Sequence, residues 1–224
     1  MKSAVIVTAA GSSDRFNHNS ERTRKKEFVL IGGNSVLYNS VKPFTEFDHV
    51  CCIVVTYKAG TLEQTETAIK DLSDKKEFIF VEGGTTRQKS VFNALLALYE
   101  NCPDIDYVAI HDGARPFVSK SLVERTFEKA ISKNAAVPAI KLNDTLVLKS
   151  KSDEIGKPLD RSEILAVQTP QIFKFSNILS AHKKAASENK DYTDDSQVYM
   201  AYGQPVYNTE GDIANKKITF EEDL

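Results

Sequence analysis

Near its start the chain reads Ser3-Ala-Val-Ile-Val-Thr-Ala-Ala-Gly-Ser-Ser-Asp-Arg15, and this stretch decides the fold. Residues 3–8 are a short apolar run rich in β-branched side chains, which predicts a buried parallel strand. The small residues Ala9, Ala10, Gly11 and Ser12 follow at once. A loop with so little side-chain bulk lets a ligand lie on the backbone, whose N–H groups can bind phosphate oxygens. The stretch therefore predicts a strand that ends in a phosphate-binding loop.

Two cations follow this loop. Arg15 stands within it, and Lys26 lies in the basic run Arg22-Thr-Arg-Lys-Lys-Glu27. Together with the loop they predict a site that holds a nucleoside triphosphate. The two standard phosphate-loop motifs do not fit, because there is no Gly-x-x-x-x-Gly-Lys-Ser/Thr run and the loop has only one glycine. The loop alone is equally typical of a tight connection between a strand and a helix.

Composition is that of a globular protein that works without nucleic acid or membrane. The 224 residues are 41% hydrophobic and 27% charged, and the net charge of −2 offers no basic excess for nucleic acid. No apolar run approaches the roughly 20 residues that span a bilayer, and the first apolar run does not resemble a signal peptide. Three cysteines, two of them adjacent, are expected as core thiols. These features predict a cytoplasmic protein.

Strand-like and helical patterns alternate along the chain, which predicts an α/β fold with a doubly wound, mostly parallel sheet. Further strands are expected at 49–56, 77–81, 107–110, 135–140, 204–209 and 217–219. Helices are expected at 35–44, 62–72, 119–134 and 174–189, with another that ends near 99 and one that starts at 193–196.

Three loops with chemical character leave the predicted strands. They follow residues 8, 81 and 110, and the second and third contain Gly83-Gly84 and His111-Asp112-Gly113. The carboxyl ends of strands in a doubly wound sheet lie along one edge, where ligands bind. The three loops are therefore expected to form one site.

Residues 141–166 interrupt the alternation. Two extended stretches, 142–148 and 159–167, flank the polar segment 149–158 and predict a hairpin arm. Such an arm is too short to have a core of its own, so a partner subunit is expected to cover its apolar side chains.

Taken in order, the motifs resemble those of the 2-C-methyl-D-erythritol 4-phosphate cytidylyltransferase family over nearly the whole chain. They are Ala-Ala-Gly-x-x-x-Arg at 9–15, Lys26 before an aromatic residue, Gly-Gly-x-x-Arg-x-x-Ser-Val at 83–91, His-Asp-x-Ala-Arg-Pro at 111–116, Asp-Thr at 144–145, Gln-Thr-Pro-Gln at 168–171, Thr-Asp-Asp at 193–195 and Asn-x-Lys-x-Thr at 215–219.

The resemblance implies one Rossmann-like nucleotidyltransferase domain over 1–224, with flanking helices and a dimerisation β-arm at about 141–166. It implies transfer of CMP from CTP to the phosphate of methylerythritol phosphate, with release of pyrophosphate and use of a divalent metal, Mg²⁺. It also implies a homodimer formed through the arm.

The resemblance assigns roles to fourteen residues. Those expected at the reacting phosphates are Arg15, Lys26 and Lys217. Those expected around the nucleotide are Ala9, Ala10, Gly11, Ser12, Gly83, Thr85, Ser90 and Asp112, and Asp112 is also the expected metal ligand. Those expected at the polyol phosphate are Arg115, Thr145 and Arg161, the last two acting on the neighbouring subunit.

Several alternatives stay open at the level of single residues. Lys25 competes with Lys26, although Lys-Glu-Phe at 26–28 matches the family's Lys-Gln-Tyr. His111 is expected as a hydrogen-bonded core histidine rather than a base. Asp194 and Asp195 are expected to cap a helix, outside the site.

The sequence also departs from the family pattern. Ser13 stands where a second glycine is usual, and Thr85 replaces a common aspartate. Asn143 stands where arginine or lysine is frequent, and Ala214 replaces the aspartate before Asn-x-Lys.

These departures leave two other functions open. Ribitol 5-phosphate cytidylyltransferases share the fold, but Ala9-Ala10-Gly11 and Gly113-Ala114-Arg115-Pro116 favour methylerythritol phosphate. A nucleotide-binding relative without activity is the second alternative.

Overall fold

The computed structural model describes residues 1–18, 24–150 and 152–224. The start of the predicted basic run, Arg22-Thr23, and Lys151 in the predicted arm lie outside the described residues. No helix of the described part is long and apolar enough to cross a membrane.

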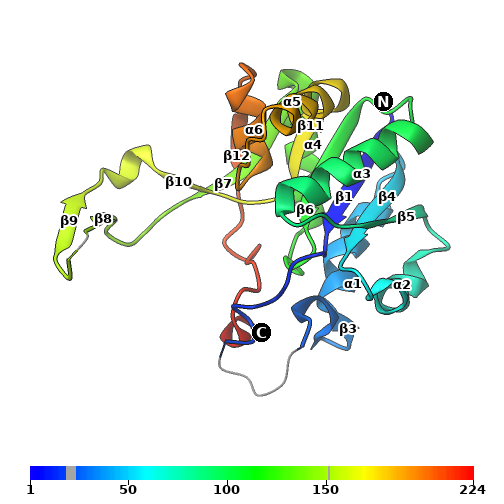
Figure 1. Ribbon diagram of the computed structural model, residues 1–224, viewed down its shortest axis with the longest axis horizontal. Helices are drawn as coiled ribbons and strands as arrows, with labels where there is room; N and C mark the ends of the chain where they lie inside the picture. The colour runs from blue at the N-terminus through cyan, green and yellow to red at the C-terminus, as the bar shows by residue number, and fades with distance from the viewer. Residues whose placement is uncertain (19–23, 151) are drawn as a thin grey trace.

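One large sheet forms the centre of the molecule (Figure 1). The predicted first strand is confirmed as β1 (Ser3–Thr8), which pairs in parallel with β4 (Val50–Tyr57) and with β6 (Tyr107–Asp112). β4 pairs in parallel with β5 (Glu77–Glu82). The central residues of all four strands are apolar, as expected for strands that are covered on both faces of the sheet.

The other half of the sheet is mixed. β11 (Gln171–Lys174) runs antiparallel between β6 and β7 (Ala135–Lys141). β7 also pairs with β10 (Leu165–Val167), antiparallel, and with β12 (Tyr207–Glu210), parallel. The strand order is β10-β7-β11-β6-β1-β4-β5. Because β10 and β11 run opposite to the other strands and the rest run in one direction, the prediction of a mostly parallel sheet is confirmed.

Helices cover both faces of the sheet, as Figure 1 shows. They are α1 (Val36–Val41), α2 (Leu62–Ile69), α3 (Arg87–Asn101), α4 (Lys120–Lys133), α5 (Phe175–Ser187) and α6 (Asp195–Ala201). Short 3-10 turns lie at Lys26–Phe28, Lys42–Glu46, Lys70–Leu72, Arg161–Glu163 and Glu221–Asp223. The predicted cap of α4 is confirmed, since the Ser119 side chain accepts a hydrogen bond from the Leu122 N–H.

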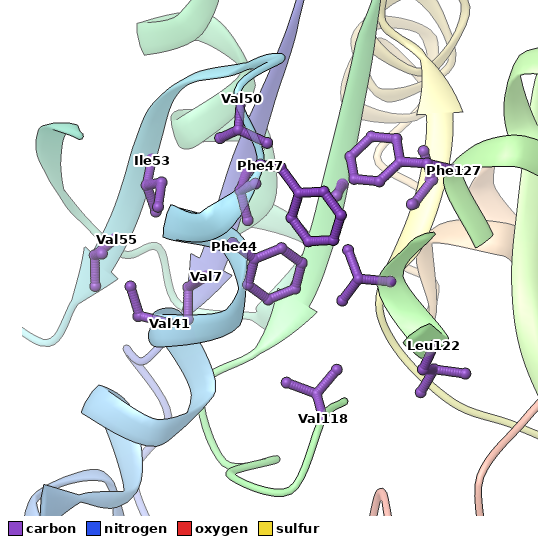
Figure 2. Close-up of a cluster of buried hydrophobic side chains, with 14 of the residues drawn as sticks. Val7, Val41, Phe44, Phe47, Val50, Ile53, Val55, Val118, Leu122 and Phe127 are labelled. Atoms are coloured by element: carbon purple, nitrogen blue, oxygen red, sulfur yellow. The ribbon is translucent and has the colours of Figure 1, made fainter. Parts of the chain in front are cut away.

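Alternate residues of β1 enter two separate cores. Val5 and Val7 pack into a cluster that includes Phe44 of the second 3-10 turn and Phe127 of α4, much of which is drawn in Figure 2. Ala4 and Ile6 point to the opposite face, where side chains of α3 and α5 cover them. Because successive side chains of β1 point to opposite faces of the sheet, this strand packs against the helices on both faces.

A small hairpin joins the first loop to α1. β2 (Leu30–Ile31) pairs antiparallel with β3 (Asn34–Ser35) across Gly32 and Gly33, whose φ angles are 60° and 86°. A two-residue hairpin turn of type I′ needs positive φ at both positions, which glycine adopts without a Cβ clash.

The arm differs from its prediction. Its hairpin consists of β8 (Val147–Lys149) and β9 (Ile155–Pro158), so the second strand lies inside the segment expected to be the polar tip. The expected strand at 159–167 is wrong as one element: residues 161–163 form a 3-10 turn, and only β10 is extended, against β7. Figure 1 shows the hairpin well away from the sheet and its helices.

The predicted strand at 217–219 is also wrong, because this segment pairs with no strand of the described chain. It is held instead by single contacts, among them the Ile218 N–H to the carbonyl of Ala114 at 2.8 Å. The segment carries Lys217 to the edge of the sheet where the three loops meet.

Candidate active site

An open cleft of about 740 Å³ lies at the carboxyl ends of β1, β5 and β6. It contains residues of all three predicted loops, which confirms that they converge. Ten of the predicted site residues line it: Ala10, Gly11, Ser12, Arg15, Lys26, Gly83, Thr85, Ser90, Asp112 and Lys217.

The first loop presents unused backbone donors to this cleft. Within the described residues, the N–H groups of Ala10, Gly11 and Ser12 donate no hydrogen bond. Ala9 differs, because its N–H donates to the Thr56 carbonyl at 3.1 Å and its side chain is buried beneath the cleft. Ala9 therefore supports the loop rather than facing a ligand. Three free amides in a row suit an anion such as a phosphate.

Ser13 is held in a backbone conformation that glycine adopts more easily. Its φ is 62°, in the left-handed region that favours glycine. The serine is held there by its hydroxyl, which donates to the buried Glu27 carboxylate at 3.2 Å. This side-chain contact holds Ser13 at its positive φ, so the loop has this conformation with a serine in place of a glycine.

The second loop packs directly on the first. A Cβ added to Gly83 would lie 2.2 Å from the Ala10 Cβ and 2.9 Å from the Ser90 hydroxyl. The Ser90 hydroxyl accepts a hydrogen bond from the Gly84 N–H at 3.0 Å, and the Thr86 side chain caps α3. Only glycine fits at position 83, so the two loops form adjoining walls of the cleft.

Cations surround the first loop. Arg15 is exposed at the cleft, and its guanidinium makes no hydrogen bond or ion pair with the described residues. Lys26 donates to the Ile218 carbonyl at 2.8 Å, and burial lowers the pKa of its ammonium group, although Glu27 opposes the shift. Lys25 instead donates to the Gly11 carbonyl and is not among the lining residues. Of the two lysines, Lys26 is the one that faces the cleft.

Asp112 lies at the end of β6 in contact with three cations. Its carboxylate is 3.3 Å from Arg87 Nε, 3.3 Å from Arg115 Nε and 2.9 Å from Lys217 Nζ. Burial raises the pKa of this carboxyl, but the three cations outweigh burial and hold the pKa well below its usual value. Asp112 is therefore an ionised carboxylate at the cleft wall.

Arg87 is a lining residue that the sequence alone did not single out. Besides Asp112 it contacts the buried Asp195 carboxylate, Nη1 to Oδ2 at 2.6 Å. Asp195 in turn lies 3.2 Å from His182 of α5. The expectation that Asp195 caps α6 is wrong, because Asp194 is the cap and Asp195 instead joins α6 to the cleft wall. Its position in the Gly-Gly-x-x-Arg motif was the sequence feature from which Arg87 could have been predicted as a site residue.

Three predicted substrate residues lie outside the lining. Arg115 is half-buried beside Asp112 and donates to the Asn215 carbonyl at 2.7 Å. Thr145 and Arg161 lie on the arm, where Arg161 donates to the Asn143 carbonyl at 2.6 Å. The structure therefore does not bring these two together with the cleft of their own chain.

His111 is confirmed as a hydrogen-bonded core histidine. It is fully buried, with Nδ1 2.9 Å from the Thr169 hydroxyl and Nε2 3.3 Å from the Arg115 carbonyl. Burial lowers the pKa of its imidazole to about 3, so the ring is neutral at physiological pH.

The acidic groups of the cleft fit a metal that is held mainly by its substrate. Asp112, Asp14 and Glu27 line the cleft, but among the described residues they form no group of three convergent ligands. Mg²⁺ commonly binds one or two carboxylates together with substrate phosphates. The donor set therefore fits Mg²⁺ brought with a triphosphate and does not form a complete metal cage.

The fold is a Rossmann-like α/β fold, in which parallel strands end at one cleft. Cations surround a small-residue loop with free amides in this cleft, an arrangement that suits a nucleotide. The sequence matches the 2-C-methyl-D-erythritol 4-phosphate cytidylyltransferase family over residues 3–224. The chain belongs to this family, whose members are nucleotidyltransferases.

Individual relatives match this chain over more than nine tenths of their length. The chain is 37% identical to a 2-C-methyl-D-erythritol 4-phosphate cytidylyltransferase of Clostridium novyi (strain NT), covering 100% of this chain and 94% of the relative. It is 38% identical to the enzyme of the same name from Dictyoglomus thermophilum, covering 98% and 92%.

Solved structures of the same kind share the fold. The crystal structure of the 2-C-methyl-D-erythritol 4-phosphate cytidylyltransferase from Thermus thermophilus has a TM-score of 0.78 and 31% identity, covering 97% of this chain and 93% of that chain. The 4-diphosphocytidyl-2C-methyl-D-erythritol synthase from Anaerococcus prevotii has a TM-score of 0.82 and 28% identity, covering 99% and 92%.

Proposed function

We propose that this chain transfers CMP from CTP to 2-C-methyl-D-erythritol 4-phosphate. A phosphate oxygen of the acceptor attacks the α-phosphorus of CTP. The bond from that phosphorus to the bridging oxygen breaks, and pyrophosphate leaves with the electron pair. The observation that carries the proposal is the row of free amides at Ala10, Gly11 and Ser12. These residues line the same cleft as Lys26 and Lys217, in a chain of this family.

Each part of the cleft has a task in this reaction. The three amides hold phosphate oxygens, and Arg15 and Lys26 offset the charge that develops on the α-phosphoryl group and the leaving oxygen. Gly83, Thr85 and Ser90 form the wall against which the base lies. Two anions must meet in this reaction, so the chain contributes position and charge rather than a covalent intermediate.

We assign Asp112 as the residue that would hold Mg²⁺ with the triphosphate. Bound there, the ion would neutralise phosphate charge as it does in other phosphoryl-transfer enzymes. Arg87, Arg115 and Lys217 keep the carboxylate ionised and fixed in place.

The arm completes the site as part of a homodimer. Its apolar side chains are exposed in the single chain, 52% for Leu148 and 81% for Ile155, and a partner subunit would cover them. Because Thr145 and Arg161 lie on this arm, they would contact the substrate phosphate in the partner's cleft. We place the enzyme in the cytoplasm, where CTP is available.

The experiment is release of pyrophosphate from CTP and Mg²⁺ with methylerythritol phosphate and ribitol 5-phosphate as separate acceptors. The proposal predicts strong preference for methylerythritol phosphate. Preference for ribitol 5-phosphate would overturn the substrate assignment, and CTP binding without release in either case would identify a non-catalytic relative.

A matched pair of lysines tests the site. Lys26→Ala is expected to lower kcat by about 10²–10³, the usual effect of removing one electrostatic contact to the transition state. Lys216→Ala removes an exposed lysine near the cleft and is expected to stay within a few-fold of wild type. Equal effects of the two substitutions would contradict the assignment of Lys26.

A further inference from the structure

Three thiols meet at the end of the sheet opposite the cleft. The sulfur atoms of Cys51, Cys52 and Cys102 all lie within 4.8 Å of one another. Cys51 and Cys52 belong to the start of β4, and Cys102 directly follows α3.

A β-bulge brings the two adjacent cysteines together. In the register of β1 with β4, Ser3 pairs with Val50 and Ala4 pairs with Cys52, so Cys51 is an extra residue. Side chains of consecutive strand residues normally point to opposite faces, and a bulge interrupts this alternation. The bulge therefore lets both thiols approach Cys102.

The three cysteine residues differ in exposure. Cys52 is fully buried and Cys102 is 7% exposed, and both pack within the core that contains Ala4 and Leu98. Their sulfur atoms are 3.1 Å apart. Cys51 is half-buried, with its sulfur 3.2 Å from the Ser3 carbonyl oxygen. Cys51 is the least buried of the three residues, so a small reagent from solvent would meet it first.

The surroundings favour a disulfide over a metal ion. Structural zinc takes four ligands, and in the described part of the chain this group offers only its three sulfurs. Three thiolates around a monovalent soft ion would leave net negative charge inside an apolar core, which is costly. A disulfide is neutral, and the two buried sulfurs need to approach by only about 1 Å to reach its bond length.

We propose that these three cysteines form an oxidation site for hydrogen peroxide, with the Cys52–Cys102 disulfide as its product. The Cys51 thiolate attacks a peroxide oxygen, giving a sulfenic acid and water. The Cys102 thiol displaces this hydroxyl as water, forming a Cys51–Cys102 disulfide. The Cys52 thiol then attacks Cys102, forming the Cys52–Cys102 disulfide and returning Cys51 as a thiol. In sum, two thiols lose two electrons and two protons, and one peroxide becomes two waters.

The cross-link would join the start of β4 to the end of α3. The other end of α3 carries Arg87 and Ser90 at the cleft, about 20 Å away along the helix axis. Because none of the three thiols lines the cleft, the oxidation can be measured independently of catalysis.

The test uses the folded wild-type protein and hydrogen peroxide. After the peroxide is removed, the chain is unfolded in iodoacetamide, digested without reduction and analysed by mass spectrometry. We expect Cys52 joined to Cys102, Cys51 alkylated, and loss of two of the three free thiols. Three alkylatable thiols under conditions that oxidise free cysteine would overturn the proposal, and so would disulfides found only between chains.

Two variants separate the roles of the thiols. Cys51→Ser keeps the buried pair but removes the accessible thiol, so the Cys52–Cys102 linkage should form several-fold more slowly. Cys102→Ala removes the linkage and should leave oxidised Cys51 as the main product. A rate of linkage in Cys51→Ser equal to that of wild type would contradict entry through Cys51.

Discussion

Replacing Asp112 by asparagine removes the one charge that holds Arg87, Arg115 and Lys217 together. The carboxylate is buried with three cations at 2.9–3.3 Å. Removing one partner of a buried ion pair typically costs about 3–5 kcal/mol, because the remaining charge is left uncompensated. Here Arg87 keeps its ion pair with Asp195, and the Lys217 side chain is 35% exposed to water, so part of the loss is compensated. We therefore expect the lower limit, about 3 kcal/mol.

Urea unfolding at neutral pH measures this loss. With a slope of about 3 kcal/mol per molar urea, the midpoint of Asp112→Asn should fall by about 1 M. Asp14→Asn is the matched control, since Asp14 lines the same cleft but is exposed, and surface substitutions usually change stability by less than about 0.5 kcal/mol. Equal midpoints for Asp112→Asn and wild type would refute the reasoning.

The pKa of Asp112 sets the pH range of this effect. A carboxyl whose folded pKa lies below its unfolded value stabilises the fold above the unfolded value, about 4, and this contribution is lost as the pH falls through the folded pKa. The difference between wild type and Asp112→Asn should therefore be constant from neutral pH down to about pH 5. A difference that shrinks already between pH 7 and 5 would mean that another group titrates.

Three further predictions concern the cleft and the arm. Burial lowers the pKa of Lys26, so kcat/KM should decrease at alkaline pH, at a pH below the ordinary lysine pKa. Lys26→Arg should move this decrease to higher pH, and an unchanged pH profile would exclude Lys26 as its source. Gly83→Ala places a Cβ against Ala10 and should cost about 1–3 kcal/mol of stability together with CTP affinity, which thermal unfolding with and without CTP would measure. Mixing inactive Lys26→Ala and Arg161→Ala dimers and allowing their subunits to exchange should restore about a quarter of wild-type activity, because half of the dimers then contain one intact site of two. No recovery of activity would contradict a site shared between subunits.

Local sequence pattern was sufficient to predict most of the fold. Short β-branched runs such as residues 3–8 became buried parallel strands, and Ser119 caps α4 as expected. The arm was misplaced because Lys149–Pro158 is polar, and a hairpin that stands away from the core needs no apolar alternation. Residues 217–219 have a strand-like composition, yet no strand edge of the described chain lies beside them, so tertiary position decides against a strand.

In the candidate site, only the residues that belong to a recognisable motif or directly follow a strand could be predicted from the sequence. Gly83 and Asp112 follow strands directly, so the topology alone brings them together. Arg87 was missed because its role depends on Asp195, more than one hundred residues away and packed against it only in the folded chain. The convergence of three thiols was missed for a similar reason, since the bulge at Cys51 arises from the pairing of β4 with β1.

The most direct test of the proposed reaction follows the phosphorus atoms of CTP. CTP labelled at the α-phosphorus and CTP labelled at the γ-phosphorus are incubated separately with the protein, Mg²⁺ and methylerythritol phosphate. Attack at the α-phosphorus predicts the α-label in the diphosphocytidyl product and the γ-label in pyrophosphate. The γ-label in the polyol product, or the α-label released as free CMP, would contradict CMP transfer by this cleft.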